Sequence, residues 1–192
     1  MFNERIKVTN GNASRQGTNL WVESLQTLGL SLLMALGIRQ FIAEARYIPT
    51  GSMEPTLQIN DRLVVEKISY RLGPPQRGDI VVFWPPDEVF AEGQPRNAFI
   101  KRVVGLPGDT VAVADGQVTI NGEPLEENYL SMPPAYQWGP QQIPADRYIV
   151  FGDNRNESFD SHRWSEPLLP EDQIIGRAVV RFWPPTRWGL IR

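Results

Sequence analysis

Few side chains in this 192-residue sequence can act as an amine or imidazole base near neutral pH. The sequence has 16 arginines, and these stay protonated in proteins and cannot accept a proton during catalysis. It has no cysteine, which excludes thiol catalysis and a disulfide framework. The amine and imidazole bases that remain are the three lysines and the single histidine: Lys7, Lys67, Lys101 and His162.

One serine lies in a segment whose backbone is restricted, Ile48–Leu57 (IPTGSMEPTL). Ser52 follows a glycine and stands between Pro49 and Pro55, which limit the conformations of their neighbours. Such a turn can hold a hydroxyl outward with a free backbone N–H beside it, which is the geometry that a nucleophile with an oxyanion hole needs. Taken alone, the segment is also compatible with an ordinary connecting turn.

One lysine lies in an apolar stretch further along the chain, Phe99–Asp109 (FIKRVVGLPGD). On a strand, Lys101 shares one face with Phe99 and Val103, so its amine is a candidate for burial. Burial lowers the pKa of an amine, and a neutral amine can then take a proton from a serine hydroxyl. The alternative is a lysine at a sheet edge that extends its amine into solvent.

A third segment, Gly152–Trp164 (GDNRNESFDSHRW), is dense in hydrogen-bonding side chains and follows an apolar run. Taken alone, it could be a solvated loop or a cation site made of carboxylates. Its oxygen ligands do not match the spacing or the closing glutamate of a calcium loop, so we expect no metal there. A Ser-His-Asp arrangement of Ser52, His162 and Asp160 is a further alternative, but an Asp/His pair two residues apart on an extended chain lacks the usual support.

The elements that must position these segments are mostly strands. Short runs rich in β-branched and aromatic residues are bounded by glycine and proline, which is typical of strands. Asp115-Gly116 and Asn121-Gly122 are two hairpin turn signals in close succession. Residues 123–146 read as a long polar excursion between strands. The expected strands are Arg62–Ile68, Asp79–Trp84, Ala98–Val104, Thr110–Ala114, Arg147–Phe151 and Gln173–Phe182.

An apolar stretch near the N-terminus predicts a membrane anchor over residues 20–45. Fifteen uncharged residues, Ser24–Ile38, form its centre, and Trp21 fits an interfacial position. A cleaved signal peptide, with Ala43-Glu44-Ala45 as its small-x-small motif, and a buried helix are the alternatives. Residues 1–19 read as a flexible polar tail, and residues 46–192 as one β-rich domain. The charges on the two sides of the stretch give only a weak orientation bias.

The charge composition argues against a nucleic-acid partner. The formal net charge is −3, and no basic run stands out. The lack of cysteine does not exclude an extracytoplasmic location, because a domain of this size does not need disulfide bonds.

The three polar segments, in this order after one apolar span, resemble the conserved boxes of type I signal peptidases, the S26-type leader peptidases with a Ser-Lys dyad. The resemblance extends from Arg46 to Arg181, and the form is similar to the compact peptidases of cyanobacteria and plant thylakoids. It implies a mainly β catalytic domain, of the fold that signal peptidases share with LexA-like self-cleaving repressors, behind one transmembrane helix. A repressor of that kind would also need an N-terminal DNA-binding module, which the first 45 residues do not offer.

The resemblance implies a role for several residues of this chain. Ser52 matches the nucleophile and Lys101 its general base, while the Ser52 N–H and the Thr50 hydroxyl form the oxyanion hole. Ser158 matches a residue that hydrogen-bonds the lysine amine. At position 162 this chain has histidine where many relatives carry arginine. The remaining implied roles are support by the acidic Asp153 and Asp160, and apolar substrate subsites formed by Ile48, Pro49, Met53, Leu57, Phe99 and Ile100.

The function implied by the resemblance is endopeptidase cleavage of signal peptides from exported preproteins after an Ala-x-Ala motif. The expected enzyme is a monomer that needs no cofactor or metal, and its partners are preproteins and the lipid bilayer. The expected location is the cell membrane, with the catalytic domain on the extracytoplasmic side, or the thylakoid membrane. The alternative from another class is a membrane-tethered β-domain that binds partners without catalysis.

Overall fold

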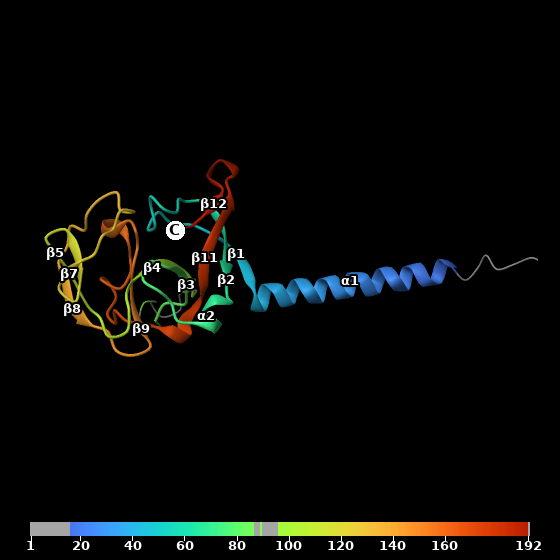
Figure 1. Cartoon of the computed structure of the whole chain (residues 1–192). Helices are drawn as coiled ribbons and strands as arrows, with labels where there is room; N and C mark the ends of the chain where they lie inside the picture. Colours follow the sequence, from blue (N-terminus) through green and yellow to red (C-terminus); the bar gives the residue numbers. More distant parts are fainter. Residues whose placement is uncertain (1–15, 87–88, 90–95, 192) are drawn as a thin grey trace, which may run out of the picture. The chain divides into compact units, whose positions relative to one another are not determined.

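The computed structural model describes residues 16–86, 89 and 96–191, so most of the predicted tail lies outside the described residues. The chain divides into two compact units, residues 1–40 and 41–192. The first contains most of helix α1 (Gln16–Phe41), and the second is built mainly of strands (Figure 1). The mainly β fold behind an N-terminal apolar helix is therefore confirmed.

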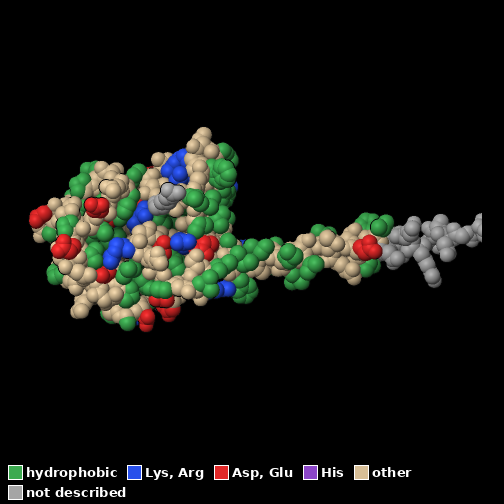
Figure 2. Space-filling model, in the orientation of Figure 1, with side chains coloured by type: hydrophobic (Ala, Val, Ile, Leu, Met, Phe, Trp, Pro, Cys, Tyr) green, Lys and Arg blue, Asp and Glu red, His purple; other side chains and the backbone are tan. Residues whose placement is uncertain are grey.

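Helix α1 is long and apolar enough to cross a membrane. Its segment Leu20–Phe41 has 22 residues and a mean hydropathy of 1.3. At 1.5 Å per residue this segment spans about 33 Å, close to the thickness of a bilayer's hydrocarbon core. Its large apolar side chains are exposed, from Ile38 at 47% to Trp21 at 76%, and uncharged atoms cover most of its length (Figure 2). A helix with such a surface needs an apolar environment.

The helix ends earlier than the predicted boundary at residue 45. Residues Ala43–Tyr47 form strand β1 instead, which pairs antiparallel with β2 (Arg62–Glu66). The sequence of β1 alternates small and charged residues and has little strand preference of its own. These residues form a strand because they pair with β2. The helix also begins at Gln16, inside the expected tail.

The second unit contains two antiparallel sheets, which Figure 1 shows at different ends of this unit. The larger sheet has the order β1-β2-β11-β3-β4-β9-β10, with β12 also paired to β11. The smaller sheet has the order β7-β6-β5-β8. The remaining elements are β3 (Ile80–Phe83), β4 (Phe99–Gly105), β5 (Thr110–Ala114), β6 (Gln117–Ile120), β7 (Glu123–Pro124), β8 (Trp138–Gln142), β9 (Arg147–Phe151), β10 (Leu169–Pro170), β11 (Ile174–Trp183), β12 (Gly189–Leu190) and the short helix α2 (Ser69–Leu72).

The six expected strands are present, with ends that differ by up to two residues. Both predicted hairpin turns are also present. Asp115 and Gly116 have φ of 51° and 78°, and Asn121 and Gly122 have φ of 55° and 86°. These left-handed values are what a two-residue hairpin loop requires. The predicted excursion over residues 123–146 is only partly irregular, because β7 and β8 lie within it and β8 pairs with β5.

Three apolar clusters hold the second unit together. One lies around Leu63, Val65 and Ile80, a second around Phe83 and Val150, and a third joins the two sheets through residues such as Val104, Val111 and Phe151.

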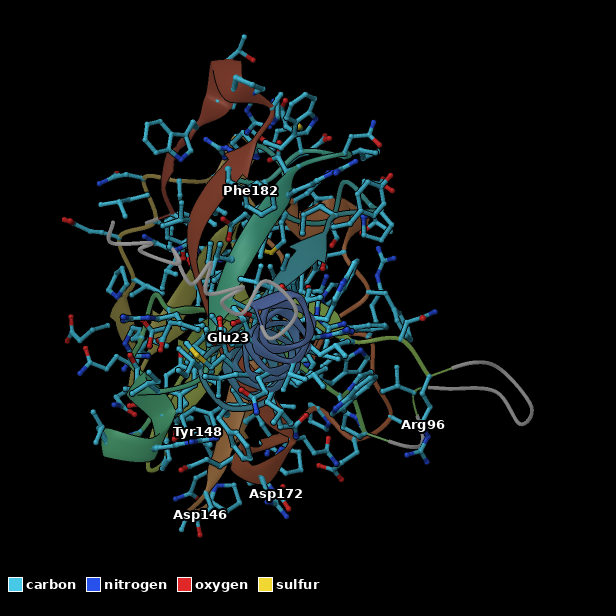
Figure 3. All side chains as sticks on the ribbon, turned by 90° about the vertical axis from the view of Figure 1, so that its right-hand side faces the viewer. Glu23, Arg96, Asp146, Tyr148, Asp172 and Phe182 are labelled. Carbon is cyan, nitrogen blue, oxygen red and sulfur yellow. The ribbon has the colours of Figure 1, made fainter. Side chains whose placement is uncertain are left out.

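At the far end of β11 from Phe182, the Asp146 and Asp172 loops come together (Figure 3), where the Glu171 N–H donates to the Asp146 carbonyl at 3.1 Å. The site-bearing strand β4 lies between β3 and β9 inside the larger sheet, so its side chains can be fully enclosed.

Candidate active site

The fold brings Ser52 and Lys101 into direct contact, although 49 residues separate them. Lys101 lies on β4, and Ser52 lies in the turn that follows β1. The Lys101 Nζ atom is 2.6 Å from the Ser52 Oγ atom. Lys101 is 4% exposed and Ser52 is 9% exposed, so the contact is largely shielded from water. Among the candidate bases that the structure describes, Lys101 is thus the one that the fold places against this hydroxyl.

The surroundings of Lys101 favour its neutral form. Burial lowers the pKa of Lys101 to about 8, because the charged amine loses its hydration. The negative charges of Asp160 and Asp153 act in the opposite direction and limit this fall. The Phe99 ring, whose centroid lies 5.8 Å from Nζ, forms part of the apolar wall. A substantial fraction of the amine is therefore unprotonated just above neutral pH.

The backbone around Ser52 is held by hydrogen bonds that leave its own N–H free. The Asn154 N–H donates to the Ser52 carbonyl at 3.1 Å, and the Asn154 side chain donates to the Gly51 carbonyl at 3.2 Å. Within the described part of the chain, the Ser52 N–H has no partner. The Thr50 hydroxyl lies 3.4 Å from Ser52 Oγ. The Thr50 hydroxyl assigned to the oxyanion hole thus lies beside the nucleophile, and the other assigned donor, the Ser52 N–H, belongs to the nucleophile's own residue.

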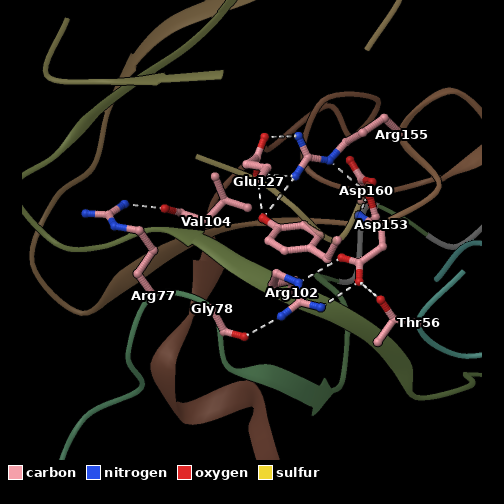
Figure 4. A network of polar contacts seen from close by, with 11 residues as sticks. Thr56, Arg77, Gly78, Arg102, Val104, Glu127, Asp153, Arg155 and Asp160 are labelled. Carbon is pink, nitrogen blue, oxygen red and sulfur yellow. Dashed lines mark hydrogen bonds and ion pairs between the residues drawn. The ribbon is translucent and has the colours of Figure 1, made fainter. Parts of the chain in front are cut away.

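Asp153 ties the lysine strand to the serine turn (Figure 4). It accepts hydrogen bonds from Arg102 Nε at 2.9 Å and Arg102 Nη2 at 2.6 Å. Its second oxygen also accepts from the Thr56 hydroxyl at 2.5 Å. Arg102 follows Lys101, and Thr56 lies four residues after Ser52. Because Asp153 binds both, this bidentate, buried ion pair holds the strand of Lys101 and the turn of Ser52 in a fixed relative position.

Asp160 is fully buried and supports the same region. Its carboxylate accepts from the Gly152 N–H at 2.8 Å and pairs with His162 Nδ1 at 2.6 Å. The other ring nitrogen of His162 accepts from Arg163 Nε at 3.2 Å. Since both nitrogens are engaged in this way, the His162 ring does not contact Ser52, and the Ser-His-Asp alternative is not assembled. Among the residues described, no group of His, Cys, Asp or Glu could hold a metal ion.

The expected hydrogen bond from Ser158 to the lysine amine is not formed. Ser158 Oγ is buried and has no hydrogen-bond partner in the described chain. It lies instead against Gly152, where a Cβ would come within 2.3 Å of Ser158 Oγ and 2.3 Å of the Ser52 carbonyl oxygen. Gly152 is therefore required for the close approach of the third segment to the nucleophile.

A groove of about 590 Å³ opens beside the Ser52–Lys101 pair. Of the six residues expected to form substrate subsites, four line it: Ile48, Pro49, Phe99 and Ile100. The expectation for Met53 and Leu57 is wrong. Both are 0% exposed and pack in the core with Leu63, Val65 and Ile80. The Leu57 N–H donates to the Met53 carbonyl at 2.9 Å, so these two side chains, four residues apart, share one face of the turn, and that face packs in the core.

Several groove residues were not singled out from the sequence. Phe159 and Glu157 come from the third segment and reach the groove beside the catalytic pair. A single phenylalanine within the otherwise polar run from Gly152 to Arg163 was the sequence signal that could have found Phe159. The residues lining the groove are Arg46, Tyr47, Ile48, Pro49, Thr50, Ser52, Val82, Asn97, Ala98, Phe99, Ile100, Lys101, Glu157 and Phe159.

Comparisons with known proteins agree on one family. The sequence model described as signal peptidase, peptidase S26, matches residues 21–183. A signal peptidase I of Leptolyngbya laminosa is 60% identical over 169 residues, covering 88% of this chain and 82% of that protein. The "Probable signal peptidase I-2" of Synechocystis is 53% identical over 186 residues, covering 97% of this chain and 84% of that protein. Thylakoidal processing peptidase 1 of Arabidopsis thaliana is 38% identical over 186 residues, covering 91% and 54%.

Proposed function

Because the chain belongs to the signal peptidase I family, the serine endopeptidases that remove signal peptides from preproteins, we propose that Ser52 is its nucleophile and Lys101 its general base. The observation that carries this proposal is the 2.6 Å contact between Lys101 Nζ and Ser52 Oγ in a buried site. The other described candidate bases have acidic partners elsewhere: Lys67 pairs with Glu44 at 2.8 Å and His162 with Asp160 at 2.6 Å.

The reaction begins when neutral Lys101 accepts the proton of the Ser52 hydroxyl. Ser52 Oγ then attacks the carbonyl carbon of the scissile peptide bond. The oxyanion of the tetrahedral intermediate is stabilised by the Ser52 N–H and the Thr50 hydroxyl. Loss of one such donor typically costs about 3 kcal/mol in the transition state.

Lys101 then passes its proton to the leaving amine, which departs as the new N-terminus of the mature protein. The acyl group remains on Ser52 Oγ as an ester. A water molecule gives a proton to Lys101 as its oxygen attacks the ester carbonyl, and Lys101 then passes that proton to Ser52 Oγ as the acid product leaves, which restores the serine. These steps balance without a metal or cofactor.

The groove suits an extended peptide with small side chains near the cut. Its walls are the segments 46–50 and 97–101, and Ile48 and Ile100 make it apolar close to Ser52. A preprotein segment bound as an added strand would place alternate side chains against these walls. These apolar walls are compatible with small apolar side chains, and the membership in the signal peptidase family leads us to assign the cut to the position after an Ala-x-Ala motif.

Incubation of the detergent-solubilised full chain with a preprotein tests this function. We expect a cut that leaves the mature N-terminus directly after the small-x-small motif, measured by mass spectrometry of both products. Ser52→Ala protein prepared in the same way is the matched control. If the wild-type chain binds the preprotein without cutting it, the chain is the tethered binding domain and the catalytic proposal fails.

The rate is expected to rise with pH through the titration of Lys101. Its pKa in the folded protein is about 8, so at pH 6 only about 1% of the amine is neutral, whereas at pH 9 most of it is. We expect kcat/KM to fall about a hundredfold from pH 9 to pH 6, as measured on a peptide that spans the cleavage site. A flat profile over this range would contradict a lysine base.

His162→Gln is expected to stay within about tenfold of wild-type activity, because glutamine can still donate to Asp160 and because His162 lies outside the reacting pair. The same peptide assay measures it. A loss as large as that of Ser52→Ala would instead assign the base to His162.

We also propose that α1 anchors the enzyme as a single membrane span with the catalytic unit on the extracytoplasmic side. The length and the apolar surface of α1 support this proposal, and the Arabidopsis relative is named a thylakoidal processing peptidase. We assign α1 to the cell membrane, with the thylakoid membrane as the alternative that the name of the Arabidopsis relative suggests. We expect the enzyme to act as a monomer.

The catalytic unit itself has an apolar surface suited to lipid. Trp183, Trp188 and Leu190 are 48%, 74% and 68% exposed on the hairpin formed by β11 and β12. Arg181 in this hairpin donates to the Thr56 carbonyl at 2.9 Å, so the hairpin adjoins the turn that carries Ser52. Tryptophan at such a surface fits the interfacial zone of a bilayer.

A further inference from the structure

Residues 127–136, here called the strap, lie between β7 and β8 and contact the catalytic machinery at several points. The sequence assigned no role to this part of the chain. Its Ala135 N–H donates to the Asn156 side chain at 2.7 Å, and Asn156 donates in turn to the Pro133 carbonyl at 3.1 Å. The Tyr136 ring stacks on His162, with 4.0 Å between centroids and 5° between planes. The strap thus contacts the third segment, Gly152–Trp164, through Pro133, Ala135 and Tyr136.

The strongest of these contacts is a buried ion pair between Glu127 and Arg155 (Figure 4). Arg155 Nη1 and Nη2 donate to the two Glu127 oxygens at 2.8 and 2.5 Å. The side chains are 6% and 0% exposed. The Tyr129 hydroxyl also donates to Glu127 at 2.5 Å. A bidentate pair at this depth has a strongly preferred geometry, so it holds Arg155 in one place.

Arg155 is connected to the nucleophile through Gly152. Its Nε donates to the Gly152 carbonyl at 3.1 Å, and the Gly152 N–H donates to Asp160 at 2.8 Å. The Gly152 Cα packs so closely on the Ser52 carbonyl that a Cβ there would approach it to 2.3 Å. A displacement of Arg155 is therefore transmitted to the Ser52 backbone and to the carboxylate of Asp160.

The strap also contacts the strand that carries the base. The Arg102 guanidinium lies over the Tyr129 ring, 3.9 Å from its centroid, in a cation–π arrangement. Arg102 is the neighbour of Lys101 and makes the bidentate pair with Asp153. Tyr129 thus touches Glu127 with its hydroxyl and Arg102 with its ring.

We propose that Glu127 is a positioning residue for signal-peptide cleavage, acting through Arg155 and Gly152 to hold Ser52 and Lys101 at reacting distance, with Tyr129 performing the same task at Arg102. The inference rests on the proposed roles of Ser52 and Lys101. Glu127 does not line the groove, so we expect its effect in the chemical step and not in substrate binding.

Glu127→Gln is the test, because it keeps the shape of the side chain and removes the charge that orients Arg155. We expect kcat to fall about 10- to 100-fold, the range that follows from a misplacement on the order of 1 Å at the reacting atoms. KM is expected to change by less than about threefold. Glu126→Gln is the matched control, since it removes the same charge from the exposed neighbouring residue and should keep wild-type kcat.

Thermal unfolding of each variant separates positioning from loss of fold. The assay temperature is set well below every unfolding midpoint, so that all variants are folded while kcat is measured. A Glu127→Gln kcat within twofold of the Glu126→Gln value overturns the proposal, and so does a loss confined to KM. Should Glu127→Gln fail to fold, Tyr129→Leu provides the measurement, with the same expected fall in kcat and the same overturning result.

The route through Arg155 is tested by a double-mutant cycle. We expect Arg155→Gln alone, and Arg155→Gln combined with Glu127→Gln, to lose the same factor in kcat within about threefold, since both remove one connection. Independent, multiplicative losses would overturn the route. An inactive wild-type chain would be a failure of the proposed function, whereas an active wild type with an unaffected Glu127→Gln is a failure of this inference alone.

Discussion

Lys101→Arg enzyme is expected to be as inactive as Lys101→Ala enzyme, with kcat/KM lower than wild type by at least about 10³-fold. Arginine keeps the positive charge and much of the length of lysine, but its guanidinium does not lose a proton in proteins. The variant therefore isolates the one property that Lys101 is proposed to supply, a neutral nitrogen beside Ser52. Hydrolysis of a cleavage-site peptide at pH 8 to 9 measures the loss.

Lys101→Met is the control that shows whether such a loss reflects chemistry or unfolding. Burial lowers the pKa of the Lys101 amine from 10.5 to about 8 in the folded protein. At a pH where the amine is charged in both the folded and the unfolded chain, this shift destabilises the folded protein by about 3 kcal/mol. The folded-state pKa is the lower one, so this penalty is fully present below pH 8 and disappears as the pH rises past 10.5. Methionine fills a similar volume without an amine, so the variant should be inactive yet more resistant to thermal unfolding at pH 7.

An active Lys101→Arg enzyme would remove Lys101 from the role of general base. The pH profile would then have to lose its rise near pH 8 as well, since both results depend on the same amine. Agreement between the two experiments is a stricter requirement than either alone.

Local sequence signals predicted the strands and hairpins well because their causes are local. Asp115-Gly116 and Asn121-Gly122 adopt the left-handed backbone that their residue types allow at low energy. The β-branched runs became strands because they suit a half-buried pleated surface. By contrast, β1 and β8 were missed. The sequences AEARY and WGPQQ have no such preference, and pairing with β2 and β5 alone makes them strands.

The candidate site could be only partly predicted from residue types, for a related reason. Ser52 and Lys101, each taken alone, were compatible with an ordinary structural role. Only the resemblance to a family made the catalytic interpretation the preferred one. The apolar character of Met53 and Leu57 could not show whether they face a groove or the core, since both environments favour the same side chains. The ion pair of Glu127 with Arg155 joins residues 28 positions apart, and no spacing in the sequence predicts it.

Ser52→Ala is expected to reduce cleavage to the uncatalysed background, a loss of at least about 10⁴-fold in kcat, because no acyl-enzyme can form without Oγ. The fold should be unaffected. Ser52 is held through its carbonyl, which accepts from the Asn154 N–H at 3.1 Å, and alanine keeps that bond. Preprotein affinity should also persist, because the groove walls at segments 46–50 and 97–101 do not change. Mass spectrometry of the products and an equilibrium binding measurement test the two halves of this prediction.

The combination of retained binding and lost cleavage is what distinguishes a nucleophile from a structural serine. A serine that only shaped the turn would, on replacement, weaken binding and lower the unfolding midpoint together, while some cutting at the same peptide bond continued. Continued cutting at that bond by folded Ser52→Ala protein would place the nucleophile elsewhere. The contact between Lys101 and Ser52 would then be a buried polar pair without a catalytic role, and the lowered pKa of Lys101 would report burial alone.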